Sequence, residues 1–240
     1  MIFRVLAAWA FTGVFWGLLS LLQLLSFKQM PGRWLQRALR YWGHKVLRIL
    51  GIELRILNES TLEERAPRVF VFNHQSALDM AWVAAIAPPA PVAIGKKQLV
   101  WVPFVNLAWW ALDFIRIDRR NPRKAMAGLE LAAREISSNR RSLGMAPEGT
   151  RTRDGSILPF KSGVFRIAVK CQVAICPVVV SGAFELLPKD SFLPRPGVIQ
   201  LSFLPPIETR GIDDSGVNEL MGRVRDAMCR AYDEMIGRSP

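Results

Sequence analysis

The feature of this chain that most constrains its fold is the alternation of short β-rich runs with helix-like runs after residue 67. The predicted strands are residues 68–73, 91–96, 113–118, 141–149, 173–182 and 198–207. The predicted helices are residues 77–87, 104–112, 122–138, 162–171 and 216–236. Strands that alternate with helices of this length predict an α/β fold with a mostly parallel sheet flanked by helices. Residues 53–240 are expected to form this α/β domain.

The first 52 residues follow a different pattern. Val5 to Phe27 carries no charge over 23 residues, and roughly 20 apolar residues suffice to cross a bilayer core. The run is too long for a cleaved signal peptide, and no small-x-small site follows it. From Arg33 to Gly51, apolar residues and tryptophans recur at helical spacing, and a second stripe is cationic: Arg33, Arg37, Arg40, His44 and Arg48. Residues 1–52 are therefore predicted to form two membrane-anchoring helices.

Two membrane arrangements fit this two-helix segment. In the first, the uncharged helix spans the bilayer and the cation-rich flank stays cytoplasmic, as the positive-inside rule requires. In the second, the two helices form a hairpin that enters only one leaflet, which the polar positions of the first helix favour. Both arrangements predict a protein of the cell inner membrane whose α/β domain lies on the cytoplasmic face. A third possibility is that both helices pack on a soluble core.

The charge distribution indicates an acidic partner. The net charge is +12, and the chain before Glu53 contains seven Lys or Arg residues and no acid. Nucleic acid and anionic lipid both attract such a segment, but the adjacent apolar run favours lipid, so no nucleic-acid partner is expected. Three cysteines and two histidines are scattered without recognisable ligand spacing. They predict neither a disulfide framework nor a metal site.

The segment NHQSALD, residues 73–79, contains the histidine best placed for chemistry. Ser76 and Asp79 have the types and spacing of a helix-capping box, so helix capping alone would explain them. Yet His74 follows the predicted strand 68–73, Glu148 follows the SLGMAP part of the run 141–149, and Asp118 is the last residue of the run 113–118. Sites in parallel sheets lie at the carboxyl ends of strands. These three strand ends could therefore converge on one crevice, which is a geometric reason to consider them together and leaves both helix capping and catalysis open for His74 and Asp79.

Four ordered blocks resemble the lysophospholipid and glycerolipid acyltransferase family. NHQSALD matches its H-x-x-x-x-D signature, and the following blocks are KKQLVWVPF (96–104), FIRIDR (114–119) and PEGTR (147–151). CPVVVSG (176–182) is similar to the family's last, proline-containing strand. The chain departs from the pattern at Asn106, where the family often has glycine. The resemblance covers roughly residues 68–182 and extends to the N-terminal helices.

The resemblance implies transfer of a fatty acyl group from an acyl thioester to the free sn-2 hydroxyl of a lysophosphatidic acid, giving phosphatidic acid for phospholipid synthesis. Imidazole is suited to accept the hydroxyl proton near neutral pH. His74 is therefore the expected general base, and Asp79 is expected to fix its tautomer and orientation. No cofactor is implied, and the donor is either acyl carrier protein thioester or acyl-CoA.

The acceptor phosphate calls for guanidinium or ammonium donors. Arg119, Arg151 and Lys97 are the predicted phosphate ligands. Gly149 and Thr150 belong to the same E-G-T-R block, and Gly149 permits an unusual backbone angle or a close approach of substrate. Glu148 is assigned either to anchoring this loop or to contacting the acceptor.

Other functions remain as alternatives. No G-x-S-x-G or phosphate-binding G-x-x-x-x-G-K-[ST] sequence occurs, which argues against a serine hydrolase and a nucleotide-driven enzyme. The acceptor could instead be a lyso-ornithine lipid, another lysophospholipid or glycerol-3-phosphate, although a membrane anchor suits an acceptor that is itself in the membrane. A non-catalytic membrane lipid-binding protein is the alternative outside enzymes.

Overall fold

A computed structural model describes the chain except residues 58–65, 97–100, 118–121 and 238–240. Seven strands form one sheet in the order β1-β7-β6-β2-β5-β3-β4. They are β1 (Ile52–Ile56), β2 (Val69–Phe72), β3 (Pro91–Lys96), β4 (Ile115–Ile117), β5 (Ser142–Met145), β6 (Ile175–Ser181) and β7 (Gly197–Phe203). All neighbouring pairs are parallel except β6 and β7. The predicted mostly parallel α/β fold is confirmed.

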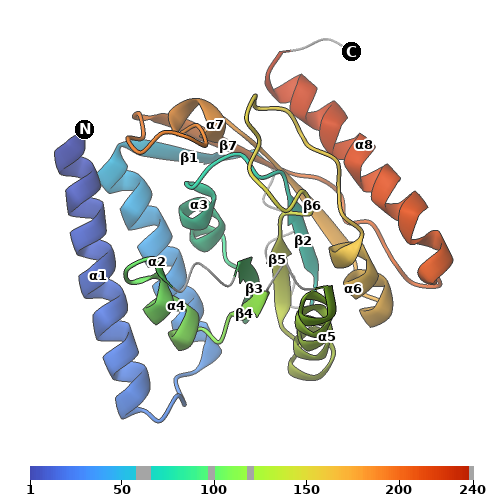
Figure 1. The fold of residues 1–240 in the computed structure, drawn as a ribbon, viewed down its shortest axis with the longest axis horizontal. Coiled ribbons are helices and arrows are strands. Elements are labelled where there is room, and N and C mark those ends of the chain that lie inside the picture. The colour runs from blue at the N-terminus through green and yellow to red at the C-terminus, as the bar shows by residue number, and fades with distance from the viewer. Residues whose placement is uncertain (58–65, 97–100, 118–121, 238–240) are drawn as a thin grey trace.

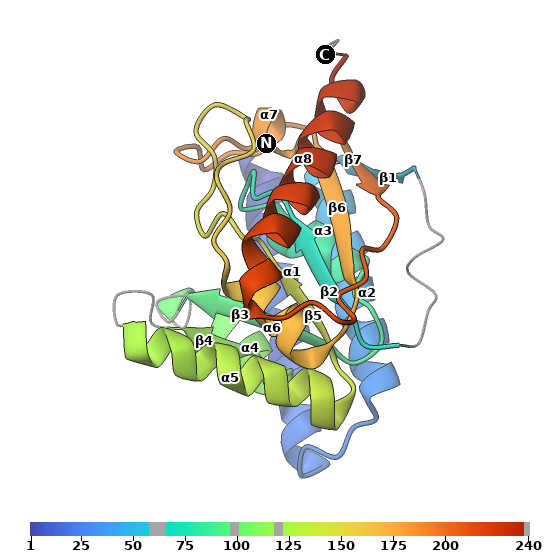
Figure 2. The ribbon, with the colours of Figure 1, turned by 90° about the vertical axis from the view of Figure 1, so that its right-hand side faces the viewer.

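Helices cover both faces of this sheet (Figures 1 and 2). They are α1 (Ile2–Leu25), α2 (Gly32–Leu50), α3 (Asp79–Ala85), α4 (Val105–Ala111), α5 (Pro122–Asn139), α6 (Gly163–Cys171), α7 (Ala183–Leu186) and α8 (Val217–Met235). The four helices α1, α2, α3 and α4 pack against one face of the sheet in one apolar cluster. The helices α5, α6 and α8 pack against the other face in a second cluster. Alternate residues of β2 serve the two clusters, since Phe70 belongs to the first and Val69 and Val71 to the second.

The edge strand β1 was not predicted. Its five residues pair in parallel with β7, and because β7 is antiparallel to β6, β1 and β7 run opposite to the other five strands. Glu53 and Arg55 on β1 are exposed and their side chains are hydrogen-bonded to each other at 2.7 Å. A strand with only three apolar residues, directly after a helix, gives little signal in the sequence.

Helix α1 lies against the rest of the protein along one stripe only. Its buried residues recur at helical spacing: Ala8, Thr12, Trp16, Leu19 and Gln23. Trp42 of α2 donates its indole N–H to Thr12 Oγ1 at 3.3 Å, and Gln23 Nε2 donates to the Ala111 carbonyl of α4 at 2.8 Å. The other faces expose large apolar side chains, including Phe3, Leu6, Val14, Leu18 and Leu25. Among the described residues, α1 is the one helix long and apolar enough to cross a membrane.

Helix α2 packs closely on α3, the helix that begins with Asp79. Gly43 makes this possible, because a Cβ there would clash with backbone atoms of Ala81 and Ala85. Arg40 Nε donates to the Ala87 carbonyl at 2.8 Å, next to the end of α3 where carbonyls lack intrahelical partners. Arg40 therefore faces α3, whereas the sequence placed it in a stripe of solvated cations. The predicted boundary between the membrane-anchoring helices (residues 1–52) and the α/β domain (residues 53–240) stays a prediction.

Replacing Gly43 with alanine should separate α2 from α3. The added methyl group meets backbone, which cannot turn aside, so we expect the free energy of unfolding to fall by about 1–3 kcal/mol, as for other overpacked cores. Urea unfolding followed by circular dichroism would measure the change. Gly222 of α8 is a matched control, because a Cβ there has no neighbour within 4 Å. Gly222→Ala should raise stability slightly, by up to roughly 1 kcal/mol. Equal effects of the two changes would contradict the proposed role of Gly43.

Candidate active site

His74 and Asp79 meet between the end of β2 and the start of α3. The chain leaves β2 after Phe72 and turns back before α3, which brings His74 Nδ1 to 2.7 Å from Asp79 Oδ2. The His74 side chain is 31% exposed, whereas that of Asp79 is only 3% exposed. The pair therefore consists of a buried carboxylate and an imidazole that solvent or substrate can reach.

Four donors surround the Asp79 carboxylate. Besides His74, the backbone N–H groups of Gln75 and Ser76 donate to Oδ2 at 3.0 and 3.1 Å, and Trp82 Nε1 donates to Oδ1 at 2.8 Å. The first turn of a helix also favours negative charge. An ionised carboxylate only accepts hydrogen bonds, so we infer that the proton of neutral His74 lies on Nδ1. That tautomer leaves the Nε2 lone pair available as a base.

The expected capping box is only half formed. Asp79 reaches back to the Ser76 N–H, as such a box requires. Ser76 Oγ instead accepts from the Leu78 N–H at 3.2 Å and donates to the Leu187 carbonyl at 2.8 Å. Ser76 thus connects the turn before α3 to the loop that follows α7. Asp79 contributes to the helix terminus and to the histidine at once.

The E-G-T-R loop after β5 holds His74 by its backbone. Glu148 Oε1 accepts from the His74 N–H at 2.8 Å and Oε2 accepts from the Leu158 N–H at 3.1 Å. The Thr152 N–H donates to the His74 carbonyl at 3.0 Å. Glu148 is 3% exposed, so its two oxygens are committed inside the protein. Of the two roles considered for Glu148, this geometry favours anchoring of the loop.

Burial changes the acidity of Glu148. Removal from water is the main cause that raises its pKa to about 7, and the nearby negative charge of Asp79 acts in the same direction. The hydrogen bonds from the His74 and Leu158 amides and the positive charge of Arg225 act against this shift. Glu148 therefore changes charge near neutral pH, next to the backbone of the candidate base.

The raised pKa of Glu148 predicts a pH dependence of stability. The ordinary pKa of this carboxyl is 4.5, so between that value and about 7 the folded protein binds more protons than the unfolded chain. Stability should then fall as pH rises through this window, by on the order of 1 kcal/mol per pH unit, and level off above it. Urea unfolding at pH 5, 6 and 7 would measure the slope. Glu148→Gln should be less stable overall but show a flatter profile, and an unchanged slope would contradict the assignment.

The rest of the E-G-T-R loop carries cations. Gly149 has a left-handed backbone with φ of 72°, and a Cβ there would lie 3.1 Å from Lys161 Nζ. Lys189 Nζ lies 3.1 Å from Thr150 Oγ1 and 3.3 Å from the Arg151 carbonyl oxygen. Arg151 is half-buried, and within the described ranges no acid lies at ion-pair distance from it. The structure thus brings Lys161 and Lys189, two lysines that sequence spacing gave no reason to select, to the loop that carries Arg151.

Two of the predicted phosphate ligands, Lys97 and Arg119, lie outside the described residues. The strands that precede them are placed: β3 and β4 are parallel, with Lys96 opposite Ile117. Both strands also run in the direction of β2 through β5. Their carboxyl ends are therefore at the same end of the sheet as His74. In the part of the chain that is described, no three His, Cys, Asp or Glu side chains lie together as metal ligands, and we assign no residue to a metal.

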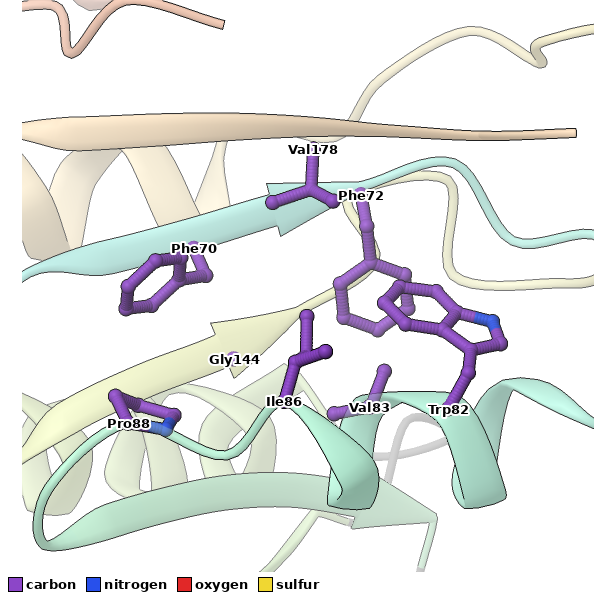
Figure 3. Close-up of a pocket in the computed structure, with 8 residues that line it drawn as sticks. All are labelled: Phe70, Phe72, Trp82, Val83, Ile86, Pro88, Gly144 and Val178. Atoms are coloured by element: carbon purple, nitrogen blue, oxygen red, sulfur yellow. The ribbon is translucent and has the colours of Figure 1, made fainter. Parts of the chain in front are cut away.

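An apolar cavity of about 30 Å³ lies between α3 and the sheet. Figure 3 shows its lining residues: Phe70, Phe72, Trp82, Val83, Ile86, Pro88, Gly144 and Val178. The Trp82 ring packs edge-on against Phe72, with centroids 5.1 Å apart. Trp82 therefore forms part of the cavity wall and also donates to Asp79. The candidate dyad is thus bordered by hydrocarbon on the side of α3.

Comparison with known proteins identifies related chains. A family model described as acyltransferase matches residues 53–181. A 1-acyl-sn-glycerol-3-phosphate acyltransferase of Limnanthes douglasii is 33% identical over 95% of this chain and 80% of its own length. Proteins of the same name from Haemophilus influenzae and, as the alpha form, from Homo sapiens are 32% and 33% identical. They align with 85% and 80% of this chain, over 80% and 70% of their own lengths.

A solved structure shares the whole fold. The crystal structure of the 1-acyl-sn-glycerophosphate (LPA) acyltransferase PlsC from Thermotoga maritima superposes with a TM-score of 0.84 at 23% identity. The match covers 100% of this chain and 97% of that one. The two N-terminal helices and the sheet are therefore shared as one architecture.

Proposed function

The chain belongs to the acyltransferase family, and we propose that it transfers a fatty acyl group from an acyl thioester to the sn-2 hydroxyl of lysophosphatidic acid, making phosphatidic acid. The resemblance seen in the sequence is confirmed, and the relatives named above are O-acyltransferases of this type. The single observation that carries the proposal for the site is the His74–Asp79 pair, with the imidazole partly exposed and the carboxylate fixed by four donors.

In the proposed mechanism His74 acts as general base. Its Nε2 accepts the proton of the acceptor hydroxyl while that oxygen attacks the thioester carbonyl carbon. Asp79 stabilises the imidazolium that forms, as carboxylates do in catalytic triads. The C–S bond then breaks, and the thiolate leaves with the proton returned by His74. No acyl-enzyme is required, because the acceptor hydroxyl is itself the nucleophile.

The cationic loop suits the acceptor phosphate. Arg151, Lys161 and Lys189 supply guanidinium and ammonium donors beside the site, and Gly149 and Thr150 lie between them. Lys97 and Arg119 are proposed to join them from the ends of β3 and β4. A phosphate of charge near −2 is best recognised by such a group, and arginine provides bidentate geometry.

Arg151→Ala should mainly weaken the use of a phosphate-bearing acceptor. Loss of a charge-assisted hydrogen bond of about 1.5–3 kcal/mol lowers kcat/KM for lysophosphatidate by roughly 10- to 100-fold, with little change in KM for the acyl donor. Steady-state kinetics with each substrate varied in turn would measure both. Arg153, an exposed neighbour in the same loop, is the matched control and its alanine variant should behave like the wild type. A change confined to the donor KM would exclude the phosphate role.

We propose further that α1 and α2 anchor the protein in one leaflet. The buried stripe of α1 contacts α2 and α4 along its length, from Thr12 to Gln23, so the helix does not stand clear of the α/β domain as a spanning helix would. Its remaining faces are apolar. For a bacterial cell the proposed location is the cytoplasmic face of the inner membrane, where the lysophospholipid acceptor and the acyl donor would meet.

An acyl-transfer assay of the purified protein tests the proposed reaction. The acceptors would be lysophosphatidate, a lysophospholipid with a larger head group, a lyso-ornithine lipid and glycerol-3-phosphate, each with acyl carrier protein thioester and with acyl-CoA. We expect lysophosphatidate to be acylated fastest with at least one donor. Preferential acylation of any other acceptor would replace the proposed substrate, and no transfer to any acceptor would overturn the enzyme assignment.

A further inference from the structure

We propose that the loop between α7 and β7, residues 187–196, is a second contact with the lipid surface, through Phe192. This side chain is 90% exposed, more than any other large hydrophobic side chain in the described ranges. Its neighbour Leu193 is 46% exposed. Single exposed apolar residues are ordinary on protein surfaces, so the inference depends on how this loop is built and where it lies.

The loop holds its apolar residues outward by fixed backbone contacts. The Arg195 N–H donates to the Leu186 carbonyl at 2.8 Å and closes the loop at its base, and the Ser191 N–H donates to the Pro188 carbonyl at 3.0 Å. Pro194, directly after Leu193, is buried. Three prolines in ten residues further limit its conformations. The exposure of Phe192 is therefore a property of the folded loop, and little ordering is needed when the ring enters lipid.

The loop adjoins the apolar surface of α1. The Gly197 N–H donates to the Gly51 carbonyl at 3.2 Å, and both Pro196 and the Arg4 guanidinium lie against Gly51. In both views the loop lies beside the N-terminal end of α1 (Figures 1 and 2). Phe3, in the first turn of α1, is 82% exposed. The loop that carries Phe192 therefore adjoins the apolar surface proposed to enter the leaflet.

The charges of the loop suit an anionic lipid surface. Lys189 and Arg195 flank Phe192, and Asp190 is the only acid between them. An aromatic side chain bordered by cations is typical of segments that bind at the interface of anionic membranes. The net charge of +12 for the whole chain acts in the same direction.

The same loop contacts the candidate active site. Lys189 lies against Thr150 and Arg151, and the Leu187 carbonyl accepts from Ser76 Oγ in the turn that leads to Asp79. Insertion of Phe192 would therefore hold the cationic loop at the level of the lipid head groups. This part of the inference rests on the proposed function, since a lysophospholipid acceptor presents its phosphate at that level.

Phe192→Ser tests the lipid contact directly. Sedimentation with vesicles of phosphatidylethanolamine and phosphatidylglycerol should show a partition coefficient roughly tenfold below that of the wild type, because a buried phenyl ring is lost. Phe192→Trp should bind as the wild type does. Leu131→Ser is the control, since Leu131 is an exposed apolar side chain too, at 46%, but lies on α5, across the sheet from α1. Equal vesicle binding by Phe192→Ser and the wild type would overturn the proposal.

Activity measurements separate this inference from the proposed function. With a long-chain acceptor held in vesicles, Phe192→Ser should be several-fold slower than the wild type. With a short-chain acceptor dissolved below its micelle concentration, the two rates should agree, and an equal loss on both acceptors would overturn the lipid contact. If the wild type acylates neither acceptor, the proposed function fails while the vesicle assay still decides the inference. A third outcome is that Phe192→Ser leaves vesicle binding unchanged but changes the molecular mass of the protein in solution, measured by light scattering. That outcome would overturn the lipid contact and show that Phe192 contacts a second copy of the chain.

Discussion

Replacing His74 with alanine is expected to lower kcat for acyl transfer by roughly 10²- to 10⁴-fold, the usual contribution of a general base. The fold should survive the change, because the imidazole is partly exposed and Asp79 keeps three other donors: the Gln75 and Ser76 amides and the Trp82 indole. Initial rates with lysophosphatidate and acyl thioester would measure the loss, and vesicle sedimentation should show unchanged membrane binding.

The second histidine provides the control for this experiment. His44 lies on α2 and is exposed, and His44→Ala should retain activity within a few-fold of the wild type. Retention of full acyl transfer by His74→Ala would remove His74 from the mechanism. Loss of vesicle binding together with activity would instead indicate that the substitution had unfolded the protein.

Asp79→Asn is expected to lower kcat by about 10⁴-fold, as an equivalent change does in a serine protease triad. An amide has one acceptor oxygen where Asp79 uses two, so its NH₂ group must face either the Trp82 indole N–H or the donors at Oδ2. If the NH₂ donates to His74 Nδ1, the ring proton moves to Nε2 and the base is lost. A buried donor left without an acceptor also costs about 1–3 kcal/mol of stability.

Both effects of Asp79→Asn can be measured on one preparation, by initial rates and by urea unfolding. Asp113→Asn is the matched control. Asp113 forms an ion pair with Lys28 at 2.6 Å but its side chain is 67% exposed, so its removal should cost well under about 1 kcal/mol. Wild-type kcat in Asp79→Asn would show that the carboxylate does not orient the base.

Much of the fold follows from local sequence patterns. Short apolar runs such as VFVF and ICPVVVS are buried on both faces of the sheet, so each leaves a continuous hydrophobic signal. Periodicity likewise located α2, α5 and α8 to within two residues of their observed ends. The antiparallel direction of β7 could not be predicted, because the sequence of a strand does not show whether it pairs parallel or antiparallel with its neighbour.

The site was predictable where its residues are close in sequence. His74 and Asp79 are five residues apart and meet through one turn. The contacts of Lys161 and Lys189 with the E-G-T-R loop depend on separate loops. The anchoring role of Glu148 depends on two backbone amides that belong to other segments. The packing of α2 on α3 depends on the absence of a side chain at Gly43, and a glycine in a helix ordinarily signals weakness of that helix rather than contact with another.

The two hydrogen bonds between the E-G-T-R loop and the backbone of His74 link the proposed phosphate site to the candidate base. The His74 N–H and carbonyl are held by Glu148 and by the Thr152 amide, so a displacement of this loop would also shift the backbone that carries the imidazole. Arg151, a proposed phosphate ligand, belongs to the same loop. A phosphate bound by Arg151 would therefore act on the position of His74 through the backbone.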